Sequence, residues 1–379
     1  MSVLTADDVL AALTDEDRAF IARTRNDGVE DPGYLTVEQV KALSPDDKLM
    51  RKYDLGLWNA AFPLVATRSV RDADLQIAAA TPSSPGPAAG LSTVTVITGK
   101  PGTGKSMYVQ DLAATQMRQL SRIRVLRTAR GEAIDLPSFD GIYGTFRPVI
   151  YLSLDRRCTP KQLFTALCDA IGWAAGDDPQ VAFGKAMAAC GTELVIIDEI
   201  QFVNFDGETG RYVHDALKWI TNSGVRLLLA GHSIKWLLRR QKTEARMAAS
   251  DQSSARWDPI EFTKLGFGTT DEQDEWLDLL EHLDARVRLA GHDPDEQVLS
   301  THFAEYLWVS TLGYLNHLKT LVTKGLNAAA STRDQRLTEN ILDRLSVESR
   351  AQETRMNRLA VWRAGKFPWD ADWHESGLG

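Results

Sequence analysis

The chain has 379 residues, of which 44% are hydrophobic and 25% are charged, and its formal net charge at pH 7 is −8. These proportions are ordinary for a globular protein and exclude a disordered or collagen-like chain. The negative net charge excludes a protein that is basic throughout, so any contact with nucleic acid must come from a local patch. No apolar run is long enough to span a bilayer, and residues 1–8 lack the basic and apolar regions of a signal peptide. We therefore expect a cytoplasmic protein.

Residues 1–90 are predicted to form a helical extension that ends in a linker. Thr5 and Thr14 are suitable helix N-caps, and the sequence Ser-Pro-Asp-Asp at 44–47 is typical of a helix start. Residues 81–90 are rich in proline, serine and glycine, a composition typical of a linker. The first domain boundary is therefore predicted near residue 90.

A phosphate-binding loop follows the linker. The β-rich run 94–98 leads into Gly-Lys-Pro-Gly-Thr-Gly-Lys-Ser at 99–106, which opens a segment with helical periodicity. Glycines allow consecutive backbone N–H groups to surround a polyphosphate, and the helix N-terminus adds partial positive charge. Lys105 is expected to reach the terminal phosphates, and the Ser106 hydroxyl to bind Mg²⁺. The predicted nucleotide-binding residues are Gly99, Lys100, Pro101, Gly102, Thr103, Gly104, Lys105, Ser106 and Met107.

Residues 91–268 alternate between predicted strands and helices, as in a parallel β-sheet with helices on both faces. The candidate strands are 93–98, 122–126, 149–154, 194–198 and 225–230. A capping box at Thr159–Gln162 with proline at the first helical position predicts a helix over 160–172. Residues 128–147 are rich in glycine and proline and are predicted to be a loop between two strands.

Two adjacent carboxylates end the most apolar of these strands. The run Leu194–Asp198 is too short for a helix and suits a strand that is buried on both faces, and Glu199 follows it. We expect Asp198 to hold Mg²⁺ through water and Glu199 to polarise the attacking water. A solvated turn is the alternative interpretation of the two acids. With the phosphate-binding loop upstream, the pair favours an enzyme that hydrolyses ATP over a simple nucleotide binder.

Only helical patterns remain after the core. Residues 269–350 are predicted to form a small helical lid, and 351–379 a polar tail that carries Trp362, Trp369 and Trp373. Because the tail lacks a periodicity that could build a core, we expect it to be mobile when alone and to dock on a partner through its tryptophans. The alternative is that these tryptophans fold back on the lid or on the N-terminal helices.

A P-loop α/β core followed by a helical lid resembles the layout of AAA+ ATPases, and the order of smaller motifs resembles the TniB and TnsC family of transposition regulators. The resemblance covers roughly residues 43–345. Besides the two nucleotide motifs, it rests on Ile200-Gln201, on Leu227–Ser233, on Ser254–Phe262 and on Leu312–Leu315.

The resemblance implies two further catalytic residues. Ser233 or His232 would be the first sensor, which detects the terminal phosphate, although Ser233 is also a suitable N-cap for a helix over 234–247. Arg256 would be the arginine finger that acts on a neighbouring subunit's nucleotide, with Arg246 as the fallback. An ordinary surface arginine is the alternative for Arg256.

One position departs from the AAA+ pattern. Lids of this kind often carry an arginine three residues after the glycine that matches Gly313, whereas this chain has Asn316. The second sensor is therefore left open, with His317 and Lys319 as possible substitutes.

Two basic clusters are candidates for DNA contact, and a solvated surface is the alternative for each. One cluster shares a helix face and contains Lys235, Arg239, Lys242 and Arg246. The other contains Arg122, Arg124, Arg127 and Arg130 and leads into the 128–147 loop. In TnsC-like rings, elements after the second strand follow the DNA backbone, so the resemblance favours the second cluster.

Taken with the resemblance, the sequence predicts an ATP-dependent, DNA-binding regulator of transposition that uses ATP and Mg²⁺. The expected catalytic residues are Lys105, Glu199, Arg256 and Ser233, and the expected metal ligands are Ser106 and Asp198. The expected partners are duplex DNA bound without sequence preference, a transposase, a target-selection protein and further copies of the chain in a ring or filament. The alternatives are a helicase loader or remodeller and a phage-defence or signalling NTPase.

Overall fold

The computed structural model describes residues 9–80, 94–132, 135–203, 207–232, 234, 257–347, 352–367 and 369. The chain forms two compact units. The first contains Met1–Asp27, Ser69–Pro101 and Lys105–Phe262, and the second contains Gly28–Arg68, Gly102–Gly104 and Thr263–Gly379.

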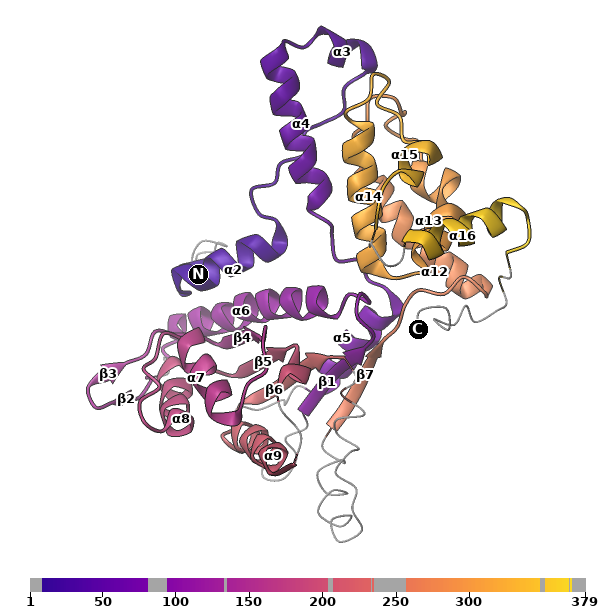
Figure 1. The fold of residues 1–379 in the computed structure, drawn as a ribbon. Coiled ribbons are helices and arrows are strands. Elements are labelled where there is room, and N and C mark those ends of the chain that lie inside the picture. The colour runs from indigo at the N-terminus through magenta and orange to yellow at the C-terminus, as the bar shows by residue number, and fades with distance from the viewer. Residues whose placement is uncertain are drawn as a thin grey trace. The chain divides into compact units, whose positions relative to one another are not determined.

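A five-stranded parallel sheet forms the centre of the first unit (Figure 1). Its strands are β1 (Val94–Gly99), β4 (Val149–Ser153), β5 (Leu194–Asp198), β6 (Arg226–Gly231) and β7 (Trp257–Phe262). Their order across the sheet is β4-β5-β6-β1-β7, and all neighbouring pairs are parallel. Parallel strands require crossover connections, which the intervening helices supply. The predicted fold class is therefore confirmed.

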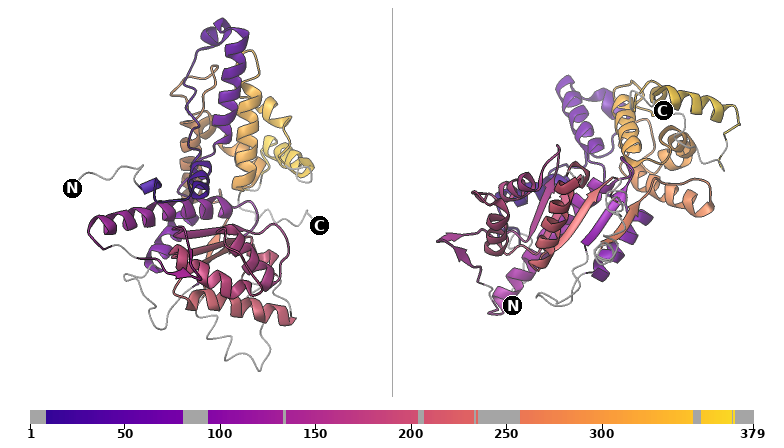
Figure 2. Two further views of the ribbon diagram at one scale, coloured as in Figure 1. Left: turned by 90° about the vertical axis from the view of Figure 1, so that its left-hand side faces the viewer. Right: turned by 60° about the horizontal axis from the view of Figure 1, so that its bottom comes forward.

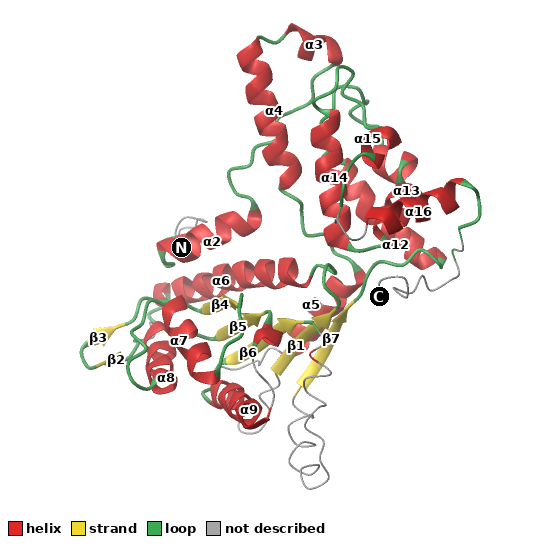
Figure 3. Ribbon diagram, viewed as in Figure 1, coloured by secondary structure: helices red, strands yellow, loops and turns green. Residues whose placement is uncertain are grey.

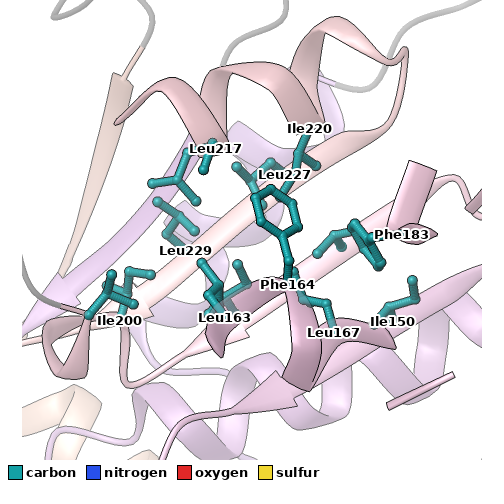
Figure 4. Close-up of a cluster of buried hydrophobic side chains, with 14 of the residues drawn as sticks. Ile150, Leu163, Phe164, Leu167, Phe183, Ile200, Leu217, Ile220, Leu227 and Leu229 are labelled. Carbon is teal, nitrogen blue, oxygen red and sulfur yellow. The ribbon is translucent and has the colours of Figure 1, made fainter. Parts of the chain in front are cut away.

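Helices cover both faces of this sheet (Figures 2 and 3). On one face lies the long helix α6 (Lys105–Ala129), and on the other lie α7 (Pro160–Ala170), α8 (Pro179–Cys190) and α9 (Gly207–Asn222). The second face packs as one apolar cluster, in which Phe164 of α7 and Leu217 of α9 contact strand side chains such as Leu229 (Figure 4). Because strand side chains alternate between faces, the residues between those of the cluster point toward α6.

Two N-terminal helices also belong to the first unit. Helix α2 (Asp15–Arg25) begins at Thr14, as its capping signal predicts, and α5 (Arg68–Ala80) precedes the undescribed residues 81–93. Arg147 pairs with the buried Asp17 of α2 at 3.4 Å. This ion pair fixes α2 to the loop that enters β4.

The predicted strand at 122–126 is wrong, because these residues continue α6. Alternating β-branched residues such as Ile123 and Val125 suggested a strand. However, Leu120 and Ser121 are buried within the same helix. Packing of one continuous helix against the sheet therefore overrides the local β preference.

The predicted loop at 128–147 contains a small hairpin. Strands β2 (Ser138–Phe139) and β3 (Ile142–Tyr143) pair antiparallel around Asp140 and Gly141, whose φ angles are 54° and 77°. Two consecutive positive φ angles are typical of a type I′ turn, for which Asp-Gly is a favoured sequence.

The sequence prediction also missed β7. Proline in the middle of an apolar run argues against a strand, because proline cannot donate a ladder hydrogen bond. Pro259 is tolerated here because, among the strands that the structure describes, β7 lies at the edge of the sheet beside β1. The alternation of buried and less buried side chains that is typical of a strand is seen in the structure, where Ile260 and Phe262 are buried.

The second unit is helical, with an apolar core of its own. Its helices are α3 (Val37–Ala42), α4 (Pro45–Ala60), α12 (Thr270–Asp284), α13 (Ala304–Thr311), α14 (Leu315–Ala329), α15 (Glu339–Asp343) and α16 (Gln352–Arg363), and Val298–His302 form one π turn. The Asn59 side chain of α4 donates to Asn327 of α14 at 2.8 Å. The predicted N-terminal extension is thus divided, since residues 28–68 belong with the helices that follow the core.

The C-terminal segment differs from the expected mobile tail. Residues 352–363 form α16, in which Arg355 and Leu359 are buried. Phe367 is buried as well, and the Trp369 ring lies 5.0 Å from that of Phe267. For Trp369, the structure therefore agrees with the alternative prediction, in which the tryptophans fold back on the lid helices. Trp373 lies outside the described residues.

Candidate nucleotide-binding site

The glycines of the phosphate-binding loop are needed by the backbone that they form. Gly102 and Gly104 have φ angles of 80° and 93°, which other residues rarely adopt. Gly99, at the end of β1, has no room for a side chain, because a Cβ there would overlap the carbonyl oxygen of Phe262 in β7. The loop therefore has the backbone that its motif predicts.

Lys105 begins α6 and directs its ammonium group at the loop. The side chain is 8% exposed, and Nζ donates to the carbonyl oxygens of Gly99 at 2.8 Å and Lys100 at 2.6 Å. Burial lowers the pKa of Lys105, and the negative charges of Glu199 and Asp198 partly offset this effect. A buried ammonium of this kind is suited to bind phosphate oxygens.

Asp198 and Ser106 come together at the carboxyl end of β5. The Asp198 side chain is 1% exposed and is hydrogen-bonded to the Ser106 side chain and to the Glu199 N–H, the latter at 2.8 Å. Burial is the main cause that raises the pKa of Asp198, and these hydrogen bonds act in the opposite direction. A hydroxyl beside a buried carboxylate is the oxygen donor set that Mg²⁺ prefers, so these residues fit the ion.

Tyr151 is a further part of the site that sequence reasoning missed. Its hydroxyl lies 3.3 Å from Asp198 Oδ2 and accepts from Gln110 at 3.2 Å. Burial is the main cause that raises the pKa of Tyr151 to about 12, so the phenol stays protonated and donates to the carboxylate. The available signal was the alternation in β4, which places Tyr151 on the face opposite its buried neighbour Ile150.

Glu199 adopts an uncommon backbone conformation. Its φ of 57° is in the left-handed region, which costs a residue with a Cβ about 1–2 kcal/mol. The Gln201 side chain holds the carboxylate, because its Nε2 donates to Glu199 Oε2. Gln201 Oε1 in turn accepts from the backbone N–H of His232 at 3.1 Å. The sequence prediction used Gln201 only as part of the family resemblance.

Several predicted residues lie outside the part of the chain that the structure describes. These are Ser233, Arg256, Trp373 and the basic cluster Lys235, Arg239, Lys242 and Arg246. The roles of Ser233 and Arg256 as first sensor and arginine finger remain predictions. His232, the alternative first sensor, is described and contributes its backbone N–H as above.

The candidates for a second sensor belong to the second unit. The backbone N–H of Asn316 donates to the Gly102 carbonyl at 3.0 Å. The His317 ring lies 5.6 Å from that of Tyr314, and Lys319 Nζ lies 6.0 Å from the centre of the Phe62 ring. These contacts assign none of the three a role in sensing nucleotide.

Residues 90–246 of the chain match the family model described as an AAA domain. This part of the protein is therefore a P-loop ATPase domain of the AAA type. No curated protein sequence matches the chain. One solved structure with similarity is that of PCH-2 from C. elegans, with 13% identity over 84% of this chain and 69% of that chain and a TM-score of 0.22. A similarity at that level does not establish a shared fold or function.

Proposed function

We propose that the protein is an ATP-dependent, DNA-binding regulator of transposition. In this proposal it assembles on duplex DNA in the ATP state, recruits or activates a transposase, and disassembles after hydrolysis. Target-selection proteins are proposed as additional partners, and the cytoplasm is the proposed location. None of the described helices combines the length and apolar character needed to cross a membrane.

The observation that carries the enzymatic part is the grouping of Lys105, Ser106, Asp198 and Glu199 at the ends of β1 and β5. Lys105 would bind the terminal phosphates, and Ser106 and Asp198 would hold Mg²⁺, which neutralises phosphate charge when bound. The Glu199 carboxylate would orient the attacking water and take up its proton. Arg256 of a neighbouring subunit would contribute further positive charge.

The role in transposition is supported by the resemblance to TniB and TnsC. The AAA domain is shared by proteins with many tasks, so the ATPase site alone does not distinguish a transposition regulator from a helicase loader. The proposal therefore depends on the partner, and a pull-down with the candidate transposase on duplex DNA decides between the two.

The second basic cluster supports contact with DNA. The structure changes the expected setting of this cluster, because Arg122, Arg124 and Arg127 lie on the last turns of α6 rather than after a second strand. Arg122 and Arg130 are exposed. Arg124 lies over the Phe146 ring at 4.3 Å, and Arg127 pairs with Glu132 at 3.6 Å. Exposed arginines of this kind suit non-specific phosphate contacts.

Two variants test the enzymatic part of the proposal. Lys105→Ala should abolish ATP hydrolysis and greatly weaken nucleotide binding, because it removes the ammonium group from the loop. Glu199→Gln should keep ATP binding but stop hydrolysis, and it should leave assemblies fixed on DNA. Undiminished turnover in Lys105→Ala would reject the site, and rapid turnover in Glu199→Gln would show that another residue activates water.

A further inference from the structure

Gln201 forms a bridge between the Glu199 carboxylate and the end of β6. It lies on the short 3₁₀ turn Ile200–Phe202, which follows β5 directly. Its amide nitrogen donates to Glu199 Oε2, and its amide oxygen accepts from the His232 N–H at 3.1 Å. One side chain therefore joins the proposed water-activating carboxylate to the strand end where the first sensor is predicted.

The chemistry of this bridge requires an amide of this length. One end must accept a hydrogen bond from a backbone N–H while the other donates to a carboxylate, and the glutamine amide carries an acceptor oxygen and a donor nitrogen on one side chain. Asparagine is one methylene shorter and cannot reach both partners. A glutamate would place a second negative charge beside Glu199. The residue type at 201 thus matches both neighbours.

Gly231, the last residue of β6, provides the space for the bridge. A Cβ at this position would overlap Gln201 Oε1 and would approach the Ile200 backbone nitrogen to 3.3 Å. Its φ angle is not in the left-handed region, so the backbone itself does not require glycine here. The absence of a side chain is explained by the approach of Gln201.

We propose that Gln201 is a positioning residue, which fixes the Glu199 carboxylate for water activation and couples it to the end of β6. This inference rests on the proposed ATPase function. Glu199 already has a strained backbone, and such strain persists only where the surroundings hold it. With Oε2 held by Gln201, the carboxylate is fixed in orientation, and in this proposal Oε1 is the oxygen that acts on the attacking water.

The first test replaces Gln201 by methionine, which has similar length but no amide. Gln201→Met should lower kcat for ATP hydrolysis about 10- to 100-fold, the usual effect of misplacing a catalytic group by about 1 Å. The affinity for ATP, measured by fluorescent-analogue binding, should change less than twofold because Gln201 is not expected to touch nucleotide. Gln119→Ala on the exposed side of α6 is the matched control and should leave kcat unchanged.

A second variant moves the bridge without changing Gln201. Gly231→Ala should lower kcat to a similar extent, since its Cβ displaces the Gln201 amide. In the double variant with Gln201→Met the losses should not multiply, because both changes remove the same interaction. Unchanged or higher turnover in Gln201→Met, or fully multiplicative losses in the double variant, would overturn the positioning role.

Hydrogen exchange of the His232 amide tests the bridge without relying on hydrolysis. Loss of its acceptor in Gln201→Met should speed exchange about five- to tenfold, whereas Gln119→Ala should not. An unchanged exchange rate would refute the bridge. If the wild-type protein hydrolysed no ATP, the proposed function and the positioning role would both be rejected, and the exchange measurement would still decide whether the bridge exists.

Discussion

Replacing Arg355 by methionine should loosen the C-terminal helix from the second unit. The Arg355 side chain is 1% exposed, and its guanidinium donates to the carbonyls of Leu345 at 2.8 Å and Leu342 at 3.0 Å. It also donates to the Tyr306 hydroxyl at 3.0 Å. These bonds join α16 to α13 and to the end of α15. A mobile tail would not form such buried hydrogen bonds with the rest of the unit.

The size of the effect follows from these three hydrogen bonds. A hydrogen bond from a charged donor contributes about 1.5–3 kcal/mol, and a buried carbonyl left without a donor costs about 1–3 kcal/mol. Methionine fills most of the volume and avoids burying a charge, which offsets part of the loss. We expect the free energy that holds α16 in place to fall by about 3 kcal/mol, or on the order of a hundredfold in the opening equilibrium.

Hydrogen exchange measured by mass spectrometry on the full chain can detect this change. Peptides from α16 should be protected in the wild type and lose about a hundredfold of that protection in Arg355→Met. Arg344→Met, at an exposed arginine of the same unit, is the control and should behave like the wild type. Protection within twofold of wild type in Arg355→Met would refute the reasoning, as would wild-type exchange at the rate of an unfolded peptide.

Three further outcomes are expected. Tyr151→Phe removes a donor that keeps the pKa of Asp198 from rising further, so hydrolysis should be lost at a higher pH as the solution is acidified, which a pH–rate profile would detect. Charge reversal at Arg127 and Arg130 should weaken DNA binding equally for all sequences and reduce the slope of log affinity against log salt by about two, whereas a sequence-dependent loss would argue against phosphate contacts. Arg256→Ala should lose DNA-stimulated hydrolysis and regain part of it when mixed with the P-loop lysine variant, and no recovery in mixed oligomers would exclude a finger acting between subunits.

The sheet could be predicted where its signals are local. Strands β1, β4, β5 and β6 are apolar runs followed by polar or glycine residues, and the structure places them close to the predicted positions. The errors occur where neighbours decide the conformation. Residues 122–126 have a strand-like pattern but extend α6, and β7 contains a proline that only an edge strand accepts. The sequence does not state which strand will be at the edge.

The residues of the candidate site also differ in how well the sequence predicts them. The phosphate-binding loop and the Asp-Glu pair are contiguous motifs, so their positions could be read from the sequence. Tyr151 and Gln201 are single polar residues whose partners come from other elements, and their contacts depend on the register of β4, β5 and β6. The packing of α16 was missed for a related reason. In the sequence, Arg355 and Arg358 are typical of a solvent-exposed helix face. The structure shows that both are buried and donate to backbone carbonyls of other segments.

Asp198 and Glu199 are neighbours in the chain, yet the structure gives their carboxylates different surroundings. Asp198 ends a regular strand, so its side chain stays in the buried layer with Ser106 and Tyr151. The backbone turns at Glu199 into the left-handed region, and this side chain meets Gln201 instead. A regular strand would have placed the two side chains on opposite faces of the sheet. In the proposed mechanism, the turn at Glu199 would allow two adjacent acids to serve one nucleotide, with the first holding a metal ion and the second acting on water.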